Sequence, residues 1–137
     1  MIKKQCYVLL IFVAVLYLDA VAAQQKFRIA NIQPITGKFN SIVVPMVNAM
    51  HLWEKNTNAL GGFLINGQNY TVEVVDIDVG SKIDAEFNNK TINETQNVVD
   101  GVYGEIHVVF APYSSDLTPI SALVSEAAGM PSIAGNI

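Results

Sequence analysis

Apolar runs alternate with segments of helical spacing along most of the chain. Three runs rich in β-branched residues, at residues 27–34, 70–78 and 105–112, predict strands, and a shorter apolar run from Met130 predicts a fourth. The third run has apolar residues at consecutive positions around Val109. Such a run is typical of a strand that is buried on both faces of a parallel sheet.

Residues with helical spacing follow each of the first three strands, so the pattern predicts three helices. We expect Ser41 to be the N-cap of the first helix, Pro45 to lie in its first turn, and the glycine pair that begins at Gly61 to end it. The residues expected to face the core are Val43, Met46, Val47, Met50 and Trp53 in the first helix, Phe87, Thr91, Thr95 and Val98 in the second, and Leu117, Ile120, Val124 and Ala127 or Ala128 in the third.

Strands that alternate with helices predict an α/β fold, a partial doubly wound parallel sheet in the order βαβαβαβ. Ligands bind to such sheets at the carboxyl ends of the strands. Three predicted loops lie at that edge, at residues 34–39 (PITGKF), 78–82 (DVGSK) and 112–116 (PYSSD). We therefore expect any ligand site to lie in these loops.

The N-terminal segment has the pattern of a secretory signal peptide, which we assign to residues 1–23. Lys3 and Lys4 precede an apolar run from Cys6 to Leu18, and small residues end at Ala23. The alternative is a membrane anchor, but the run is shorter than the ~20 apolar residues of a spanning helix. The sequence therefore predicts a protein that is secreted or lies on the extracellular face of the plasma membrane.

Charge and cysteine content narrow the classes of partner and site. Cleavage would remove two lysines and one aspartate, which changes the net charge from −4 to −5, and the chain has no basic run. We expect neither nucleic acid nor an anionic membrane surface as partner. The only cysteine, Cys6, would leave with the signal peptide, so we predict no disulfide. His51 and His107 have no ligand spacing around them, and we predict no metal and no cofactor.

Three Asn-X-Thr sequons follow the predicted signal peptide, at Asn69, Asn89 and Asn93. They are compatible with glycosylation in a eukaryotic secretory pathway. Asn89 and Asn93 would share the outer face of the second helix, where two glycans would crowd each other.

Two groups of polar residues stand at predicted strand ends. Asp76 and Asp78 are compatible with metal binding or acid–base chemistry, but a solvated loop edge is favoured because no third ligand or base accompanies them. Ser114 and Ser115 stand where the third strand turns into a helix, so their hydroxyls and the free N–H groups of the helix start favour an anion, most simply a carboxylate. The alternative is that one serine only caps the helix.

Four motifs in this order resemble the start of the type I periplasmic-binding fold: IANIQPITGKF, NALGGFLINGQNYTVEVVDID, EIHVVFAPYSSDLTPIS and AAGMPSIAG. The most similar subgroup comprises the leucine/isoleucine/valine-binding proteins and the ligand-binding region of metabotropic-glutamate-like receptors. The resemblance covers residues 27–137 and implies the N-terminal lobe of a two-lobed fold that closes on a small ligand, often an amino acid.

The resemblance also implies roles for individual residues. In that family a serine run after the third strand holds the ligand carboxylate, which implies this role for Ser114 with Ser115 and a backbone or ring contact for Tyr113. A second set of contacts follows the fourth strand, which implies a role for Asn136. Asp116 replaces the third serine of the family's run. The resemblance implies a hinge and a second lobe beyond the matched residues, and dimerisation through the first lobe is a further prediction.

We therefore expect the N-terminal part of a receptor ectodomain that binds a small solute. The alternatives are a solute-binding protein of a transport system and a non-functional truncated gene product. No nucleophile elbow, metal triad or phosphate-binding glycine loop is visible, so we do not expect an enzyme. A hydrolase or flavin protein on a similar sheet rests on fold analogy alone.

Overall fold

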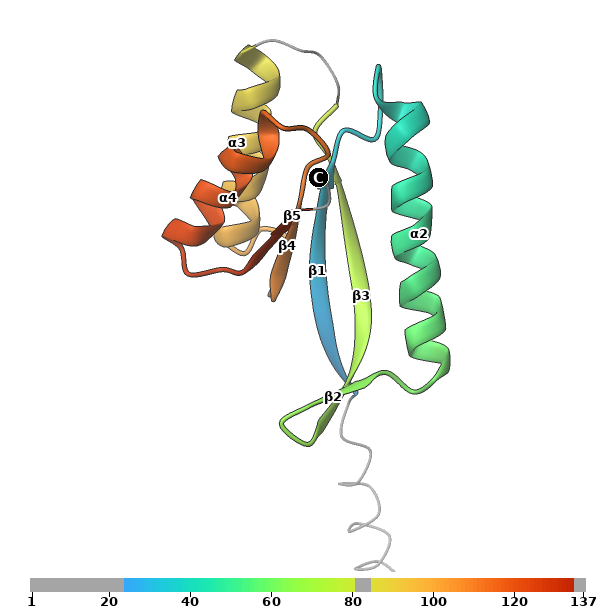
Figure 1. The fold of residues 1–137 in the computed structure, drawn as a ribbon. Helices are drawn as coiled ribbons and strands as arrows, with labels where there is room; N and C mark the ends of the chain where they lie inside the picture. The colour runs from blue at the N-terminus through green and yellow to red at the C-terminus, as the bar shows by residue number, and fades with distance from the viewer. Residues whose placement is uncertain (1–23, 81–84, 135–137) are drawn as a thin grey trace, which may run out of the picture.

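A computed structural model describes residues 24–80 and 85–134, in which helices cover both faces of a twisted sheet (Figure 1). The predicted signal peptide, Asn136 and part of the 78–82 loop lie outside these residues. The elements in chain order are β1 (Gln25–Gln33), α2 (Asn40–Ala59), β2 (Phe63–Ile65), β3 (Gln68–Asp78), α3 (Ala85–Val99), β4 (Val108–Ala111), α4 (Leu117–Ala127) and β5 (Ser132–Ala134).

Within the described residues the strand order is β2-β3-β1-β4-β5, with β1 at the centre. The pairs β1–β3, β1–β4 and β4–β5 are parallel, as predicted. The prediction missed β2, which pairs with β3 in antiparallel orientation through a turn at Asn66 and Gly67, whose φ angles are 51° and 82°. Three residues are too few for a periodic signal, so the sequence pattern did not reveal β2. The sheet is therefore mixed, with one antiparallel edge strand.

The helices divide between the two faces of the sheet. In Figure 1, α2 lies on one side of the sheet and α3 with α4 on the other. Two apolar clusters fill the two interfaces, one around Ile32, Val109 and Leu117 and the other around Ile29 and Val108. Because Val108 and Val109 lie in different clusters, β4 is buried on both faces, as its sequence predicts.

The start of α2 differs from the prediction. The helix begins at Asn40, one residue before Ser41, and Phe39 is its N-cap without a side-chain hydrogen bond. Instead, the side chain of Asn40 donates to the carbonyl of Ile35 at 2.9 Å, which ties the helix start to the preceding loop. Pro45 consequently lies past the first turn, where its missing N–H removes one hydrogen bond of the helix.

Helical spacing identified the helices better than it identified their buried faces. Trp53 was predicted to lie in the core but is 45% exposed. In α3, by contrast, Phe87, Thr91, Thr95 and Val98 are all buried, as predicted.

In α4 the prediction of the buried face was partly wrong. Leu117 is buried as predicted, but the other buried residues are Ser121 and Ser125, whereas Ile120 and Val124 are only partly buried and Ala127 and Ala128 are exposed. The hydroxyl of Thr95 donates to the hydroxyl of Ser121 at 3.2 Å, so small polar residues line the contact between α3 and α4. Their small size and mutual hydrogen bonds let them replace apolar residues at this interface.

Arg28 anchors the amino edge of the sheet, at the opposite end from the predicted ligand loops. Its guanidinium bonds to Glu73, at 3.2 Å, and to the carbonyl oxygen of Tyr103, at 2.6 Å. Gly104 lies against this guanidinium with a φ of 78°, and a Cβ atom there would lie 2.6 Å from Nη1 of Arg28. The positive φ and the nearby guanidinium together favour a glycine at this position in the chain before β4.

Candidate functional site

Residues 112–116, which contain Ser114 and Ser115 and are called the serine turn below, lie at the carboxyl edge of the sheet, between β4 and α4. The amide N–H of Tyr113 donates to Oε1 of Gln33 at 2.9 Å, and the N–H of Ser114 donates to the carbonyl of Pro112 at 2.9 Å. From the helix side, the hydroxyl of Thr118 donates to the carbonyls of Pro112 and Ser114, both at 2.9 Å. The backbone of the turn is thus fixed from both sides.

The two serines are not equivalent. Oγ of Ser114 accepts the N–H of Asp116 at 3.3 Å, and its carbonyl accepts the N–H groups of Leu117 and Thr118. Ser114 therefore contributes to the start of α4, although Asp116 is the N-cap and makes no side-chain cap bond. Ser115 is exposed, and its hydroxyl makes no hydrogen bond within the described part of the chain. That hydroxyl is free to bind a ligand.

The loop after β1 is held by the carboxylate of Asp78. It accepts the N–H groups of Ile35, Thr36 and Gly80, at 2.9, 3.2 and 2.8 Å, and the hydroxyl of Thr36 at 2.6 Å. Burial acts to raise the pKa of Asp78, but the hydrogen bonds from Thr36, Gly80 and Ile35 together lower it. Asp78 is therefore a structural acceptor for the loop, at an edge of the sheet that is still partly exposed.

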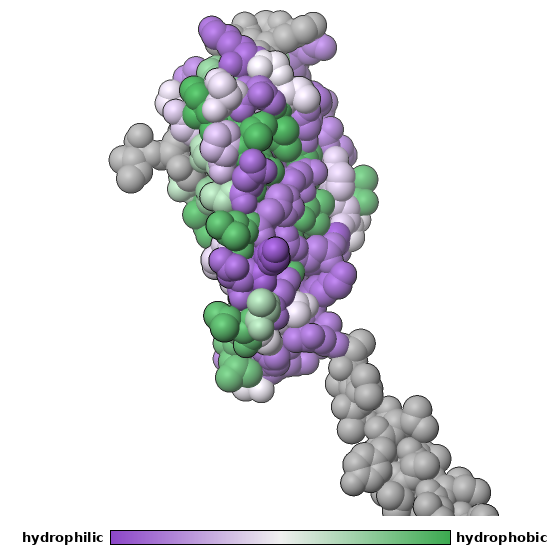
Figure 2. All heavy atoms as spheres, turned by 90° about the vertical axis from the view of Figure 1, so that its right-hand side faces the viewer, coloured by the Kyte–Doolittle hydropathy of each residue, from purple (hydrophilic) through white to green (hydrophobic). Residues whose placement is uncertain are grey.

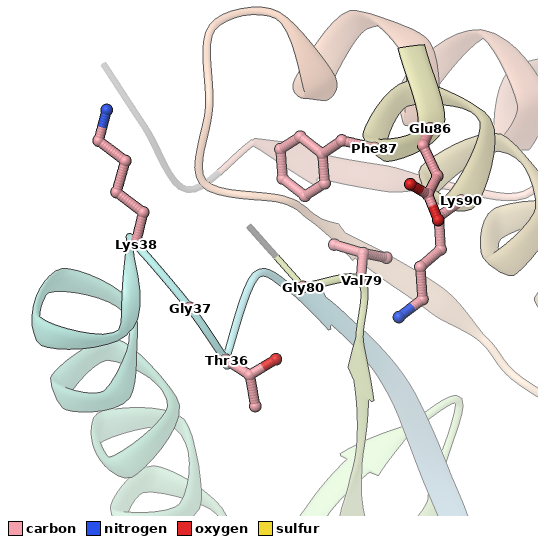
Figure 3. A pocket seen from close by; sticks show the side chains of 8 residues that line it. All are labelled: Thr36, Gly37, Lys38, Val79, Gly80, Glu86, Phe87 and Lys90. Carbon is pink, nitrogen blue, oxygen red and sulfur yellow. The ribbon is translucent and has the colours of Figure 1, made fainter. Parts of the chain in front are cut away.

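A hollow of about 490 Å³ opens between this loop and α3 (Figure 3). In this view Phe87 lies between Lys38 on the α2 side and the pair of Glu86 and Lys90 on α3, and the amino group of Lys38 points away from the hollow. The hollow is lined by Thr36, Gly37, Lys38, Val79, Gly80, Glu86, Phe87 and Lys90. The predicted 34–39 loop thus borders a real hollow, whereas Tyr113, Ser114 and Ser115 do not line it.

Asp76 belongs to a chain of polar contacts between α2 and the sheet. Its carboxylate accepts Nδ2 of Asn31 at 2.7 Å and contacts Nε2 of His51 at 2.6 Å, while Nδ1 of His51 contacts Glu54 at 2.8 Å. The hydrogen bonds to Asp76 and Glu54 raise the pKa of His51. His51 is thus a bridge between helix and strand, and Asp76, like Asp78, has a structural role. His107 packs its ring on Phe27, with ring centroids 4.8 Å apart.

The structure limits other kinds of site. Across residues 24–80 and 85–134, no three His, Cys, Asp or Glu side chains lie close enough to hold a metal ion. Among the same residues, no helix has the length and apolar character needed to cross a membrane.

The three sequon asparagines, Asn69, Asn89 and Asn93, are all exposed. Nδ2 of Asn69 donates to the carbonyl of Gly61 at 2.7 Å, whereas Asn89 and Asn93 lie on the outer side of α3. Glycosylation at these positions remains a prediction.

Sequence reasoning missed Gln33, which joins the two predicted loops. It is only 1% exposed, its side chain contacts the serine turn, and its carbonyl accepts the N–H of Val79, a residue of the hollow, at 3.0 Å. The only available signal was a glutamine directly before Pro34, at the end of an apolar strand.

Comparisons with known proteins identify the fold. No protein-family model matches the chain, and no curated protein does. Among solved structures, the chain is similar to the substrate-binding protein LivJ of a branched-chain amino acid transporter from Streptococcus pneumoniae, solved in complex with isoleucine. The match has a TM-score of 0.65 and 24% sequence identity, and it covers 80% of this chain but 28% of LivJ. The chain therefore has the fold of a single lobe of a type I periplasmic-binding protein.

Proposed function

We propose that the chain is an extracellular module that binds a small solute, an amino acid or a similar carboxylate, as the N-terminal part of a receptor ectodomain. Residues 1–23 are its signal peptide, and residues 27–137 belong to its N-terminal lobe. The observation that carries the proposal is the serine turn. Its backbone is fixed by Gln33 and Thr118, yet the hydroxyl of Ser115 has no partner in the described residues.

The chemistry of the turn fits a free amino acid. The hydroxyls of Ser114 and Ser115 can donate to a carboxylate at the start of α4, where the helix dipole also favours negative charge. Asp116 is exposed in the same turn, and its carboxylate favours a ligand that carries an ammonium group as well. An α-amino acid has both groups on one carbon atom.

The alternative is a solute-binding protein of a transport system, the class to which LivJ belongs. A receptor transcript would continue through a second lobe into membrane-spanning helices, whereas a transport protein would end after that lobe. Sequencing the 3′ extension of the transcript distinguishes the two, and a stop codon after Ile137 would favour a truncated product.

Binding can be tested on the secreted chain by adding isoleucine and glutamate and recording ¹H–¹⁵N spectra. A single lobe contacts only one side of a ligand, so we expect a dissociation constant of about 1 mM or weaker. The amide signals of residues 113–116 should shift on titration. Absence of any shift with a broad set of amino acids would contradict the proposal.

Hydroxyl deletions identify the residues involved. Ser114→Ala with Ser115→Ala should weaken binding about tenfold or more, because charge-assisted hydrogen bonds are lost. Thr57→Ala removes a hydroxyl near the end of α2, far from the serine turn and outside the sequons, and is the matched control. If the serines only support the helix start, their replacement should lower the melting temperature and leave affinity unchanged.

The extracellular context is tested by expression in a eukaryotic secretory host. The mature protein should begin at Ala23 or Gln24 and lose mass on glycosidase treatment. Secreted material that retains Met1 would contradict the signal-peptide assignment.

A further inference from the structure

Gln33 lies where the backbone pairing between β1 and β4 stops. The ladder pairs Ile29 with Val108, Ala30 with Val109 and Asn31 with Phe110, and Gln33 lies two residues beyond the last pair. Its side chain nevertheless continues the contact. Nε2 donates to the carbonyl of Ala111 at 3.1 Å, and Oε1 accepts the N–H of Tyr113 at 2.9 Å.

The two partners of this amide have the spacing of a parallel ladder. In such a ladder a residue bonds, through its own N–H and C=O, to the residues before and after its neighbour on the other strand. Ala111 and Tyr113 flank Pro112 in this way. A carboxamide offers an N–H donor and a C=O acceptor, as a peptide group does. The side chain of Gln33 therefore makes the two hydrogen bonds that a backbone peptide group would make if the β1–β4 pairing continued.

We propose that Gln33 is a positioning residue that sets the place of the Tyr113–Ser115 turn relative to the loop after β1. The role of Gln33 at a ligand site rests on the proposed function, whereas its role in fixing the turn does not. The carbonyl of Gln33 accepts the N–H groups of Ile35, at 2.9 Å, and Val79, at 3.0 Å. One residue therefore connects the ends of β1, β3 and β4 at the candidate site.

The burial of Gln33 makes this contact specific for an amide. Ala111 offers only an acceptor and Tyr113 only a donor, so the side chain must present one donor and one acceptor in fixed places. Leucine offers neither. An ionised glutamate would place an oxygen against the carbonyl of Ala111, whereas a protonated glutamate could donate there and still accept the N–H of Tyr113.

This difference gives a test with a pH readout, on the ¹⁵N-labelled secreted chain. In Gln33→Glu the Tyr113 amide should match the wild type near pH 4.5 and shift progressively at higher pH. Burial should move the midpoint above about pH 6, well beyond the ordinary range of a glutamate. In Gln33→Leu the Tyr113 amide should be shifted at every pH, and its hydrogen exchange should accelerate about tenfold. Gln68→Glu, an exposed glutamine at the opposite edge, is the control.

The outcomes separate positioning from binding. A Tyr113 amide that is unchanged in Gln33→Leu, or independent of pH in Gln33→Glu, would overturn the proposal. If Gln33→Leu does not fold, the pH series of Gln33→Glu still decides the matter. Isoleucine titration of the same variants forms a separate arm. A Tyr113 response without amino-acid binding in the wild type would support the positioning role and count against the proposed function.

Discussion

The two faces of the sheet carry opposite gradients of polarity. On the α2 face, β1 and β3 are apolar toward the amino edge, with Phe27, Ile29, Val72 and Val74, and polar toward the carboxyl edge, with Asn31, Gln33, Asp76 and Asp78. On the α3/α4 face the order is reversed, with Lys26, Arg28 and Glu73 followed by Ala30, Ile32, Val75 and Ile77.

Because of this difference, the two faces of the sheet contribute to the candidate site in different ways. Toward the carboxyl edge, the α3/α4 face is packed with apolar side chains, while on the α2 face the side chains of Gln33 and Asp78 accept hydrogen bonds from the N–H groups of the loops. The apolar face supplies stability, and the polar face fixes loop positions, because hydrogen bonds are directional and apolar contacts are not.

The α2 face is also less completely covered. A hollow of about 700 Å³ lies on it beside Trp53, bordered by Phe27, Ile29, Val108 and Ile133. Seen from the α2 side, the surface is mainly polar over its middle, with apolar side chains toward the lower end near β2 (Figure 2). Leu60, 88% exposed, and Leu64, 71% exposed, contribute apolar surface in the α2–β2 region.

The largest effect is expected from shortening one isoleucine on each face. Ile32→Ala should cost about 2–5 kcal/mol of unfolding free energy, because Ile32 is completely buried and leaves a closed cavity. Ile29→Ala should fall at the lower end of that range because Ile29 already borders the open hollow. Urea denaturation followed by circular dichroism measures both values. An equal or larger cost for Ile29→Ala would contradict the comparison.

Replacing the hydroxyls of Thr95 and Ser121, between α3 and α4, tests whether water reaches the interior of the α3/α4 face. Thr95→Val should cost about 1–2 kcal/mol, because the buried hydroxyl of Ser121 loses its donor. The double variant Thr95→Val with Ser121→Ala should cost no more than the single one, since no polar group is then left unpaired. A double-mutant cycle from thermal unfolding measures the coupling. Strictly additive costs would indicate that water reaches the pair.

The charged amino edge should contribute less. The hydrogen bond from Lys26, together with the charge and hydrogen bond of Arg28, lowers the pKa of Glu73 against the opposing effect of burial. Because the folded pKa is the lower one, this contribution is present above the ordinary glutamate value and is lost as pH falls through the folded value. Glu73→Gln should cost about 1 kcal/mol or less at neutral pH and flatten the acid limb of the stability profile. An unchanged acid limb would contradict this assignment.

The smallest effect is expected at His51 on the α2 face. Its hydrogen bonds to Asp76 and Glu54 raise its pKa, so its contribution is complete below the ordinary histidine value and is lost as pH rises through the raised folded value. His51 is 42% exposed, so the loss should stay under about 0.5 kcal/mol. Comparing stability of the wild type and His51→Gln from about pH 6 to pH 8 measures it. A His51 ring that titrates at or below the ordinary value by NMR would refute the bridge.

The sequence predicted the parts of the fold that depend on local pattern. Consecutive apolar residues around Val109 identified a strand buried on both faces, and the spacing from Phe87 to Val98 identified the buried face of α3. It placed α4 correctly but not its full buried face, because Ser121 and Ser125 are buried through hydrogen bonds that depend on neighbouring residues.

The candidate site was predictable only in outline. The position of the serine turn follows from the alternation of strands and helices, and the resemblance added a role that the structure leaves as a proposal. Gln33 could not be identified as part of the site, because its partners, Ala111 and Tyr113, are distant in sequence and meet it only across the sheet. The exposure of Trp53 was likewise invisible, since helical spacing does not say which part of a helix face is left beside an open hollow of the sheet.

The close approach of Gly104 to Arg28 constrains the evolutionary history of both positions. A side chain gained at position 104 would displace the guanidinium of Arg28 from its bonds to Glu73 and Tyr103, so that substitution weakens the amino edge while Arg28 is present. Shortening Arg28 first would abandon its bonds to Glu73 and Tyr103 but open the space. Even then the positive φ of 78° favours asparagine over other residues. Among related chains, substitutions at these two positions should therefore occur together, with the change at position 28 the older of the two.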